Sequence, residues 1–478
     1  MLVSFWRSQC VAVKSVYYSF LRRLSALIIL LLLIVLLVLV VSLVLVVLLI
    51  LLILVISLVL LVLIILIVRH FFASFFDDED SFPHFWETIQ CNYFAKRRRG
   101  RFMLLIRNGL LYTMEETRAR RADLLIKDGK IKEISDTITP TEQMEIFDAE
   151  GLLVFPGFID AHSHIGIAEE RTNEQIDPSN EGTNPITPCL RAIDAIDPMD
   201  SAFHNALAAG ITGAMCGPGS SNAVGGQFAF IKTHGRRVDD MIVLAPAAIK
   251  LAFGENPMTN YGMNGNIPST RMGIASLIRE ELYNARQYFD TNSSGTFSME
   301  CYRELFEGRI PLKAHVHRAD DIFTAIRIVK EFGLGLTLDH CTEGHLIAEE
   351  IAESGFPAIV GPSLASRTKE EVSLSDFKTP GILQKAGVKV ALTTDHPVSR
   401  IQYLPLCAAL SVKEGMDEWA ALRAITIDAA EICRVDKRLG SLKAGKDADL
   451  AILDGSPLEI SASVRATIVN GEIVWKAP

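Results

Sequence analysis

Paired cysteines are missing from this chain of 478 residues. Its eight cysteines are scattered and include no C-x-x-C pair. Four of them, Cys216, Cys341, Cys407 and Cys433, stand in apolar or helical-looking surroundings. We therefore expect reduced thiols, as in a cytosolic compartment, and no disulfide framework.

Positive charge is scarce beyond the first hundred residues. The formal net charge is −9, but Met1–Phe102 carries ten Lys and Arg against five Asp and Glu, so the remainder is near −14. A protein that binds nucleic acid needs a basic patch to neutralise phosphates. This charge balance excludes nucleic acid as a partner of the remainder.

Turn residues are missing from one long apolar run, residues 26–68, which consists almost wholly of Leu, Ile and Val. As a helix it would extend roughly 64 Å, about twice the ~30 Å hydrocarbon core of a bilayer. Arg22 and Arg23 precede it and Arg69 follows it. Positive charge on both flanks favours two spans with both ends in the cytoplasm, although no Gly, Pro or Asn marks a turn between them.

Two interpretations of residues 1–102 stay open. The tract is either one or two transmembrane helices, or spurious low-complexity sequence from an over-extended reading frame. Met103 stands where globular patterning begins, so the second interpretation predicts a functional protein that starts near Met103. Membrane association follows only if residues 26–68 are translated and inserted. The catalytic part is expected in the cytoplasm in both cases, anchored in the first and soluble in the second.

Short alternating segments begin at Met103 and return at the end of the chain. MLLIRNGLLY, ADLLIKDGKIKEIS and MEIFDAEGLLVFPG read as strands joined by Asn-Gly and Asp-Gly turns, and DADLAILDG and SVRATIVNGEIVW resume the pattern. We expect residues 103–155 and 438–478 to form one β-sandwich, with the middle of the chain inserted between its two parts.

The middle of the chain, residues 156–437, alternates strands with helices, which predicts a parallel sheet. Eight segments read as strands: LLVFPGFIDAH, ITGAMCG, GQFAFIK, AAIKLAF, IPLKAHVH, GLGLTLDH, PAIVGPS and VKVALTTDH. Helical segments such as DDIFTAIRIVKEFG and EGHLIAEEIAESG are each stopped by a glycine. The expected fold class is therefore α/β, a (β/α)8 TIM barrel with a composite β-sandwich and an N-terminal hydrophobic segment.

Polar residues stand at the ends of the predicted strands. His162 and His164, in FIDAHSHIG, lie on the same side of an extended chain and can aim both rings at one point. Further candidates on or just after the later strands are Lys250, His315, His317, His340 and Asp395. In a parallel barrel these positions converge on the C-terminal face, which predicts a metal site there.

PGFIDAHSH, AHVHRADDI, LDHCTEGH, LTTDHP and LGSLKAGKDADLAILDG together give the chain a family resemblance. From about Phe102 to Trp475 it resembles the amidohydrolase superfamily, in its imidazolonepropionase-like and prolidase-like branch. That resemblance implies a barrel with a composite β-sandwich, and it also implies site roles. His162 and His164 would bind one metal ion, His315 and His340 a second, Lys250 would be a carboxylated bridge, and Asp395 both ligand and catalytic base.

The residue types support this chemistry independently. Neutral imidazoles and a carboxylate suit Zn²⁺, the expected ion, or a similar divalent ion. A bound ion lowers the pKa of water from 15.7 to about 7 and polarises a carbonyl, so no serine or cysteine nucleophile is required. For Lys250 an alternative stays open, an ammonium paired with Glu255.

Two residues after the fifth strand are candidates for substrate binding. His317 shares the parity of His315, although a solvated residue at the strand end is an equal alternative. Arg318 could hold a substrate carboxylate, the alternative being a salt bridge to Asp320 or Asp321. His345 is expected to be a surface or cap residue, and GPGSSNAVGGQ a loop near the site.

The expected function is a metal-dependent amidohydrolase that cleaves a C–N amide bond with metal-activated hydroxide. Its small-molecule substrate would be an N-acyl amino acid, a peptide or a cyclic amide. Imidazolonepropionases and related deaminases carry an acidic residue soon after the fifth-strand histidine, where this chain has HVHRADD. An imidazolonepropionase-like ring hydrolase or deaminase is therefore the second expectation, and a non-catalytic, membrane-anchored barrel protein the third. A homo-oligomer is compatible with all three.

Overall fold

The computed structural model describes residues 103–168, 177–291 and 293–478. These described residues form one compact unit. The hydrophobic tract at residues 26–68, with both interpretations of it, lies outside the described residues. Within the described ranges, no helix has the length and apolar character needed to cross a membrane.

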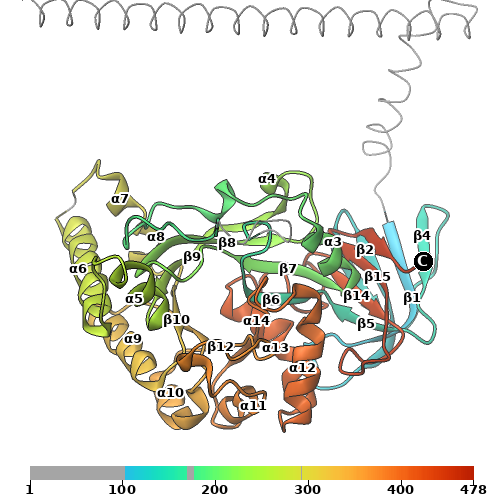
Figure 1. The fold of residues 1–478 in the computed structure, drawn as a ribbon. Helices are drawn as coiled ribbons and strands as arrows, with labels where there is room; N and C mark the ends of the chain where they lie inside the picture. Colours follow the sequence, from blue (N-terminus) through green and yellow to red (C-terminus); the bar gives the residue numbers. More distant parts are fainter. Residues whose placement is uncertain (1–102, 169–176, 292) are drawn as a thin grey trace, which may run out of the picture. The chain divides into compact units, whose positions relative to one another are not determined.

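The fold is mixed α/β and is built around a nearly closed barrel sheet (Figure 1). Its eight strands follow one another in chain order: β6 (Phe158–Ser163), β7 (Ile211–Cys216), β8 (Val224–Lys232), β9 (Ile242–Ala252), β10 (Leu312–Val316), β11 (Leu336–His340), β12 (Ala358–Val360) and β13 (Val390–Leu392). The segment after β13 is tied back to β6, because Thr393 Oγ1 donates to Asp160 Oδ1 at 2.7 Å. All eight strands coincide with segments predicted from the sequence.

One strand contradicts the expected parallel order. β8 pairs antiparallel with both β7 and β9, whereas the other neighbouring pairs in the sheet are parallel. The physical reason lies in the connections. Residues 217–223 and 233–241 are too short for a crossover back to the same edge, which takes about a dozen residues or more. The chain therefore departs from a strict (β/α)8 arrangement at β8.

Helices pack on the barrel sheet and share one large apolar core with it. Their bounds are α3 (Ser201–Ala208), α4 (Val238–Met241), α5 (Glu255–Gly262), α6 (Arg271–Asp290), α7 (Phe297–Glu300), α8 (Arg303–Phe306), α9 (Ala319–Phe332), α10 (Ala348–Ser354), α11 (Lys378–Lys385), α12 (Leu404–Lys413), α13 (Glu418–Ala424) and α14 (Ile427–Ile432). Four 3-10 turns are η1 (Ala192–Asp194), η2 (Gly344–Leu346), η3 (Glu370–Val372) and η4 (Ile401–Tyr403). As predicted, α9 and α10 end at Gly333 and Gly355, whose positive φ values of 66° and 75° close each helix.

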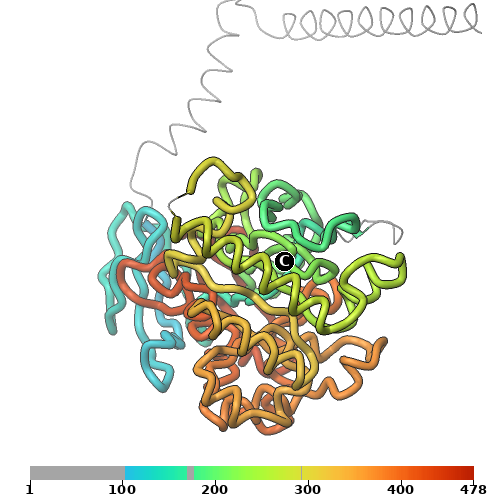
Figure 2. The backbone as a smooth tube through the Cα atoms, turned by 90° about the vertical axis from the view of Figure 1, so that its left-hand side faces the viewer, coloured from blue at the N-terminus to red at the C-terminus, as the bar shows by residue number. Residues whose placement is uncertain are grey.

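A second sheet combines strands from both ends of the described chain. It contains β1 (Met103–Leu111), β2 (Arg120–Lys127), β3 (Lys130–Ser135), β4 (Met144–Asp148), β5 (Leu153–Pro156), β14 (Leu450–Leu453), β15 (Val464–Val469) and β16 (Glu472–Lys476). β14 joins the two groups, because it pairs with β5 on one side and β15 on the other. Figures 1 and 2 show the first strands, in blue and cyan, beside the last, in red. Apolar residues of both groups form one core.

Two of the four Asn-Gly and Asp-Gly dipeptides in the predicted strand segments form tight turns between strands, and the prediction was wrong for Asn108-Gly109. Asp128-Gly129 and Asn470-Gly471 join β2 to β3 and β15 to β16, with positive φ at both residues of each turn. Asn108-Gly109 instead lies inside β1 as a bulge. Asn108 has a φ of 61° and is held there by Asp123, whose Oδ1 accepts from its backbone N–H at 2.9 Å.

A buried ion-pair cluster joins the barrel sheet to the second sheet. Lys232, at the end of β8, is 2% exposed and donates to Asp447, Asp449 and Asn470 at 2.9, 3.0 and 2.5 Å. These three partners precede β14 or follow β15. The motif GKDADL therefore has a structural role here.

Replacing Lys232 with Met is expected to destabilise the protein by about 3–5 kcal/mol, because the buried carboxylate of Asp449 loses its cationic partner. Asp447, in contrast, keeps Lys130 and Arg438. Urea unfolding measures the effect. Lys437→Met removes an exposed lysine from the segment after α14 and is the control. Equal unfolding midpoints for the two variants would contradict this role.

Candidate metal centre

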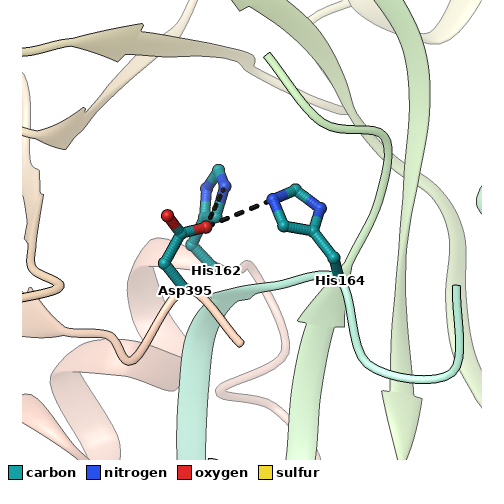
Figure 3. Close-up of side chains that lie close together, drawn as sticks. All are labelled: His162, His164 and Asp395. Atoms are coloured by element: carbon teal, nitrogen blue, oxygen red, sulfur yellow. Dashed lines mark ion pairs between the residues drawn. The ribbon is translucent and has the colours of Figure 1, made fainter. Parts of the chain in front are cut away.

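His162, near the end of β6, and His164, just after it, meet a carboxylate from the segment after β13. Asp395 Oδ1 lies 3.2 Å from His164 Nε2 and 3.5 Å from His162 Nε2, and all three residues are buried. Figure 3 shows both rings turned toward this carboxylate. His162 and His164 come from one edge of the barrel sheet and Asp395 from the other, so closure of the sheet builds the cluster.

Four histidines of the site make a hydrogen bond through Nδ1 to a group outside the cluster. The partners are Asp339 Oδ2 for His162, the Gly217 carbonyl for His164, Thr342 Oγ1 for His317 and the Gly361 carbonyl for His340, each at 2.7 Å. A carbonyl or carboxylate accepts only, so Nδ1 carries the proton in His162, His164 and His340. In the neutral ring, Nε2 then presents a lone pair to the cavity, as metal-binding histidines do.

The electrostatics fit a bound cation. Burial lowers the pKa of His162, His315 and His340, and nearby positive groups lower it further for His162 and His315. In the described part of the chain, His315 Nε2, His340 Nε2 and Asp395 Oδ1 are buried without a hydrogen-bond partner. The lone pairs of His162 Nε2 and His164 Nε2 face Asp395 Oδ1 and repel it unless a cation lies between them. These residues therefore fit a divalent metal ion.

A second group of possible ligands lies beside the first. Ligand atoms of His315, His317 and Glu371 lie within 4.8 Å of one another, as do those of His162, His164 and Asp395. His340 belongs to neither group by this distance, but its ring centroid lies 4.4 Å from that of His315 and 5.0 Å from that of His162. His340 thus lies between the two groups. It is close to His315, with which the sequence resemblance pairs it as a ligand of the second ion.

Lys250 lies beneath the cluster. It is fully buried, and its Nζ lies 3.3 Å from His162 Nε2. Its neighbours Ile249 and Leu251 pack into the core on the helix side of the sheet, so the lysine points into the barrel as expected. Burial lowers the pKa of Lys250 to about 8, although Asp339 and Asp395 oppose the shift. The alternative partner Glu255 instead accepts from the Glu371 backbone at 3.3 Å.

Asp160 fixes the position of Asp395 and was missed in the sequence. Its Oδ2 accepts from Thr394 Oγ1 at 2.5 Å and Thr394 N at 3.2 Å, and burial raises its pKa to about 6. Asp395 and His340 both have positive φ, 53° and 76°. Non-glycine residues seldom adopt this conformation, and such strain clusters at functional sites.

Asp339 and Lys313 form a second supporting pair that sequence reasoning missed. Asp339 Oδ2 accepts from His162 Nδ1 at 2.7 Å and lies 3.1 Å from Lys313 Nζ. Lys313 also donates to the Ala161 carbonyl at 3.1 Å. The sequence did contain a signal for this pair, because an acidic and a basic residue each stand inside an apolar strand. Charged residues buried in this way are almost always paired.

The site opens into a cleft of about 630 Å³. His164, His315, His317 and Asp395 line it, and so do Gly219, Ser220 and Ser221 of the loop predicted near the site. Arg318 is not among the lining residues and pairs with Asp320 at 2.9 Å, so its placement favours the salt-bridge alternative over substrate binding. His345 lies in η2, where its Nδ1 contacts Thr379 Oγ1 at 3.1 Å, outside both ligand groups.

Glu371 was also missed. It comes from η3, in an irregular and highly charged segment that reads as a surface loop. Burial disfavours the charge of Glu371, but His317 and Lys369 outweigh that effect and hold its pKa below the usual value. No local pattern in the sequence predicts its burial against two histidines.

Comparison with known proteins agrees with the geometry. Residues 344–475 match the amidohydrolase family. A solved amidohydrolase from Thermotoga maritima MSB8 is 38% identical and covers 78% of this chain and 100% of its own, with a TM-score of 0.76. The imidazolonepropionase of Mycolicibacterium smegmatis is 24% identical over 75% of this chain and 92% of its own length.

Two further relatives extend the comparison. Amidohydrolase tasK of Hapsidospora irregularis is 27% identical over 78% of this chain, but this chain spans only 43% of the length of tasK. A prolidase solved with N-methylphosphonate-L-proline is 18% identical with a TM-score of 0.54, a likeness of fold alone. The 38% identity to the Thermotoga maritima protein over its whole length shows that this chain belongs to the amidohydrolase superfamily.

Proposed function

We propose that this protein is a metal-dependent amidohydrolase that cleaves a C–N amide bond of an N-acyl amino acid, a peptide or a cyclic amide. The observation that carries the proposal is the convergence of His162 Nε2 and His164 Nε2 on Asp395 Oδ1 at the floor of the cleft. A divalent ion held there, with Zn²⁺ the expected one, lowers the pKa of water and polarises the amide carbonyl. His315 and His340, with a carboxylated Lys250 as bridge, are the proposed ligands of a second ion.

Asp395 is the proposed catalytic base. Burial disfavours its charge, but the polar and charged groups around it, Lys250 among them, outweigh burial and hold its pKa below the usual value, so the carboxylate is ionised. Its carboxylate can take a proton from the attacking water and return it to the leaving nitrogen. Such a role contributes typically about 10²–10⁴-fold to the rate.

His317 is the proposed substrate-binding residue. Its Nδ1 is held by Thr342 at 2.7 Å, and the ring lines the cleft beside His315. This arrangement leaves Nε2 available to hydrogen-bond the substrate or to stabilise developing charge.

An imidazolonepropionase-like ring hydrolase or deaminase is the second candidate. The sequence lacks an acidic residue soon after His315, but Glu371 Oε1 lies 4.0 Å from His315 Nε2 and 3.9 Å from His317 Nε2. A carboxylate is therefore near the fifth-strand histidines after all. Ammonia release from an amino-substituted ring, without amide hydrolysis, would favour this candidate.

Metal removal tests the proposal. Dialysis of the purified protein against dipicolinate should remove the divalent ion, abolish hydrolysis of an amide library and lower the melting temperature. Added Zn²⁺ should restore the metal content, the hydrolysis and the melting temperature. Elemental analysis by mass spectrometry gives the metal content. Unchanged hydrolysis by metal-free protein would refute the proposal.

A further inference from the structure

A lysine side chain, Lys369, lines the cleft and is not one of the proposed metal ligands. Lys369 lies just before η3, in the segment that joins β12 to α11. Of the described residues that line the cleft, it alone is a lysine or arginine. Apart from the carboxylates of Asp177 and Asp395, the other lining residues are small, polar, apolar or imidazole-bearing, so Lys369 is the partner there for an anionic group of a ligand.

Two hydrogen bonds hold the ammonium group of Lys369 in place and leave one of its N–H donors unused. Its Nζ lies 2.7 Å from Asn256 Oδ1 and 2.5 Å from Glu371 Oε1. An ammonium group has three N–H donors, so these contacts leave one. The side chain is 27% exposed and lines the cleft, which is where the remaining donor can be used.

Both partners of Lys369 are themselves fixed. Asn256 Nδ2 donates to Ser220 Oγ at 2.7 Å, and Glu371 Oε2 accepts from the Glu255 backbone N–H at 2.8 Å. A flexible lysine loses side-chain entropy when it binds a ligand. Because these contacts already hold Lys369, much of that cost is met before a ligand arrives.

Lys369 also stands at a suitable distance from the proposed reaction centre. Glu371 Oε1 lies 2.5 Å from Lys369 Nζ and 4.0 Å from His315 Nε2, so these nitrogens are no farther apart than the two distances together. In an N-acyl α-amino acid, three bonds of roughly 1.3–1.5 Å separate the amide carbonyl carbon from the carboxylate carbon. A carbonyl near the histidines thus places the carboxylate within reach of Lys369.

We propose that Lys369 determines substrate specificity by binding a free carboxylate on the leaving amine of the amide. This inference rests on the proposed function and selects N-acyl amino acids and peptides with a free carboxyl end from its substrates. The salt bridge between ammonium and carboxylate orients the scissile amide toward Asp395. Arg318, the carboxylate partner expected from the sequence, is engaged with Asp320 outside the cleft.

The test compares matched substrates and matched variants. Each member of a panel of N-acetyl-L-amino acids is paired with its decarboxylated N-acetylamine, and acetate release from both is measured with the metal-loaded protein. The variants are Lys369→Met, Lys369→Arg and Lys378→Met. Lys378 is the control, because it is a nearby exposed lysine that pairs with Asp376 and does not line the cleft.

The wild type should prefer the acids. Lys369→Met should lower kcat/KM for the acids by about 10–100-fold more than for the amines, the range expected for one charge-assisted hydrogen bond to the carboxylate. Lys369→Arg and Lys378→Met should retain the preference. The inference is overturned, and the proposed function stands, if acids and amines react equally, if Lys369→Met slows both alike, or if only cyclic amides react. Absence of hydrolysis of every amide overturns both.

Discussion

Asp395→Asn should lower turnover by about 10²–10⁴-fold or more, with the fold and most of the bound metal retained. The substitution keeps the size of the side chain and one oxygen near His162 and His164. It removes the negative charge and the capacity to accept a proton at the cavity. The loss should therefore fall on kcat, because the amide is still bound but its hydrolysis lacks a base.

Three measurements separate this result from simple damage: kcat for a hydrolysed amide, metal content and the circular dichroism spectrum. Asp320→Asn is the matched control, because it makes the same change at an exposed carboxylate paired with Arg318. Near-normal turnover of Asp395→Asn, or loss of all metal and of the fold, would remove the assigned role.

Local patterns predicted the strands and several positions of the site. The eight segments of the barrel sheet were recognisable because each is a short apolar run, and His162, His164, His340 and Asp395 stand at or just beyond the ends of such runs. Neighbouring parallel strands then bring those ends to the same face of the barrel, and this does not depend on how the individual side chains pack. The site's location thus follows from order and spacing.

The antiparallel orientation of β8 could have been predicted from the sequence, but we expected a parallel strand. Its flanking connections contain no segment long enough for a crossover helix, and that length alone indicates an antiparallel strand. Asn108-Gly109 shows the opposite problem. The same dipeptide type forms a turn at Asn470-Gly471 and a bulge in β1, and the contact with Asp123 that distinguishes them is not local.

Residues that support the site depend on contacts between distant segments. Asp160 holds Thr394, and Asp339 holds His162, each across most of the barrel sequence. Lys369 reaches the cleft, and Glu371 reaches His315 and His317, only because an irregular segment packs there. Composition predicts such a segment to be a solvated loop, so neither residue was recognised before the structure placed it.

Lys250 is the residue on which the proposed second ion depends, and Lys250→Ala should lose one metal ion and most activity. An ammonium at that depth would be repelled by two divalent ions. A neutral amine can instead add carbon dioxide with loss of a proton, which gives a carbamate anion that can bridge both ions. The inward orientation of Lys250 and its contact with His162 at 3.3 Å suit that bridge, and its pKa, lowered to about 8, makes the neutral amine accessible.

Short carboxylic acids should partly rescue the Lys250→Ala variant, because acetate or formate can occupy the space left by the carbamate and supply a bridging carboxylate. Elemental analysis should show the second ion returning with added acid, in parallel with turnover. Lys389→Ala, which removes an exposed lysine paired with Glu431, is the control and should respond to neither treatment. If Lys250→Ala keeps two ions and full turnover, the carbamate is eliminated. Glu371, already buried against His315 and His317, would then be the carboxylate that holds the second ion.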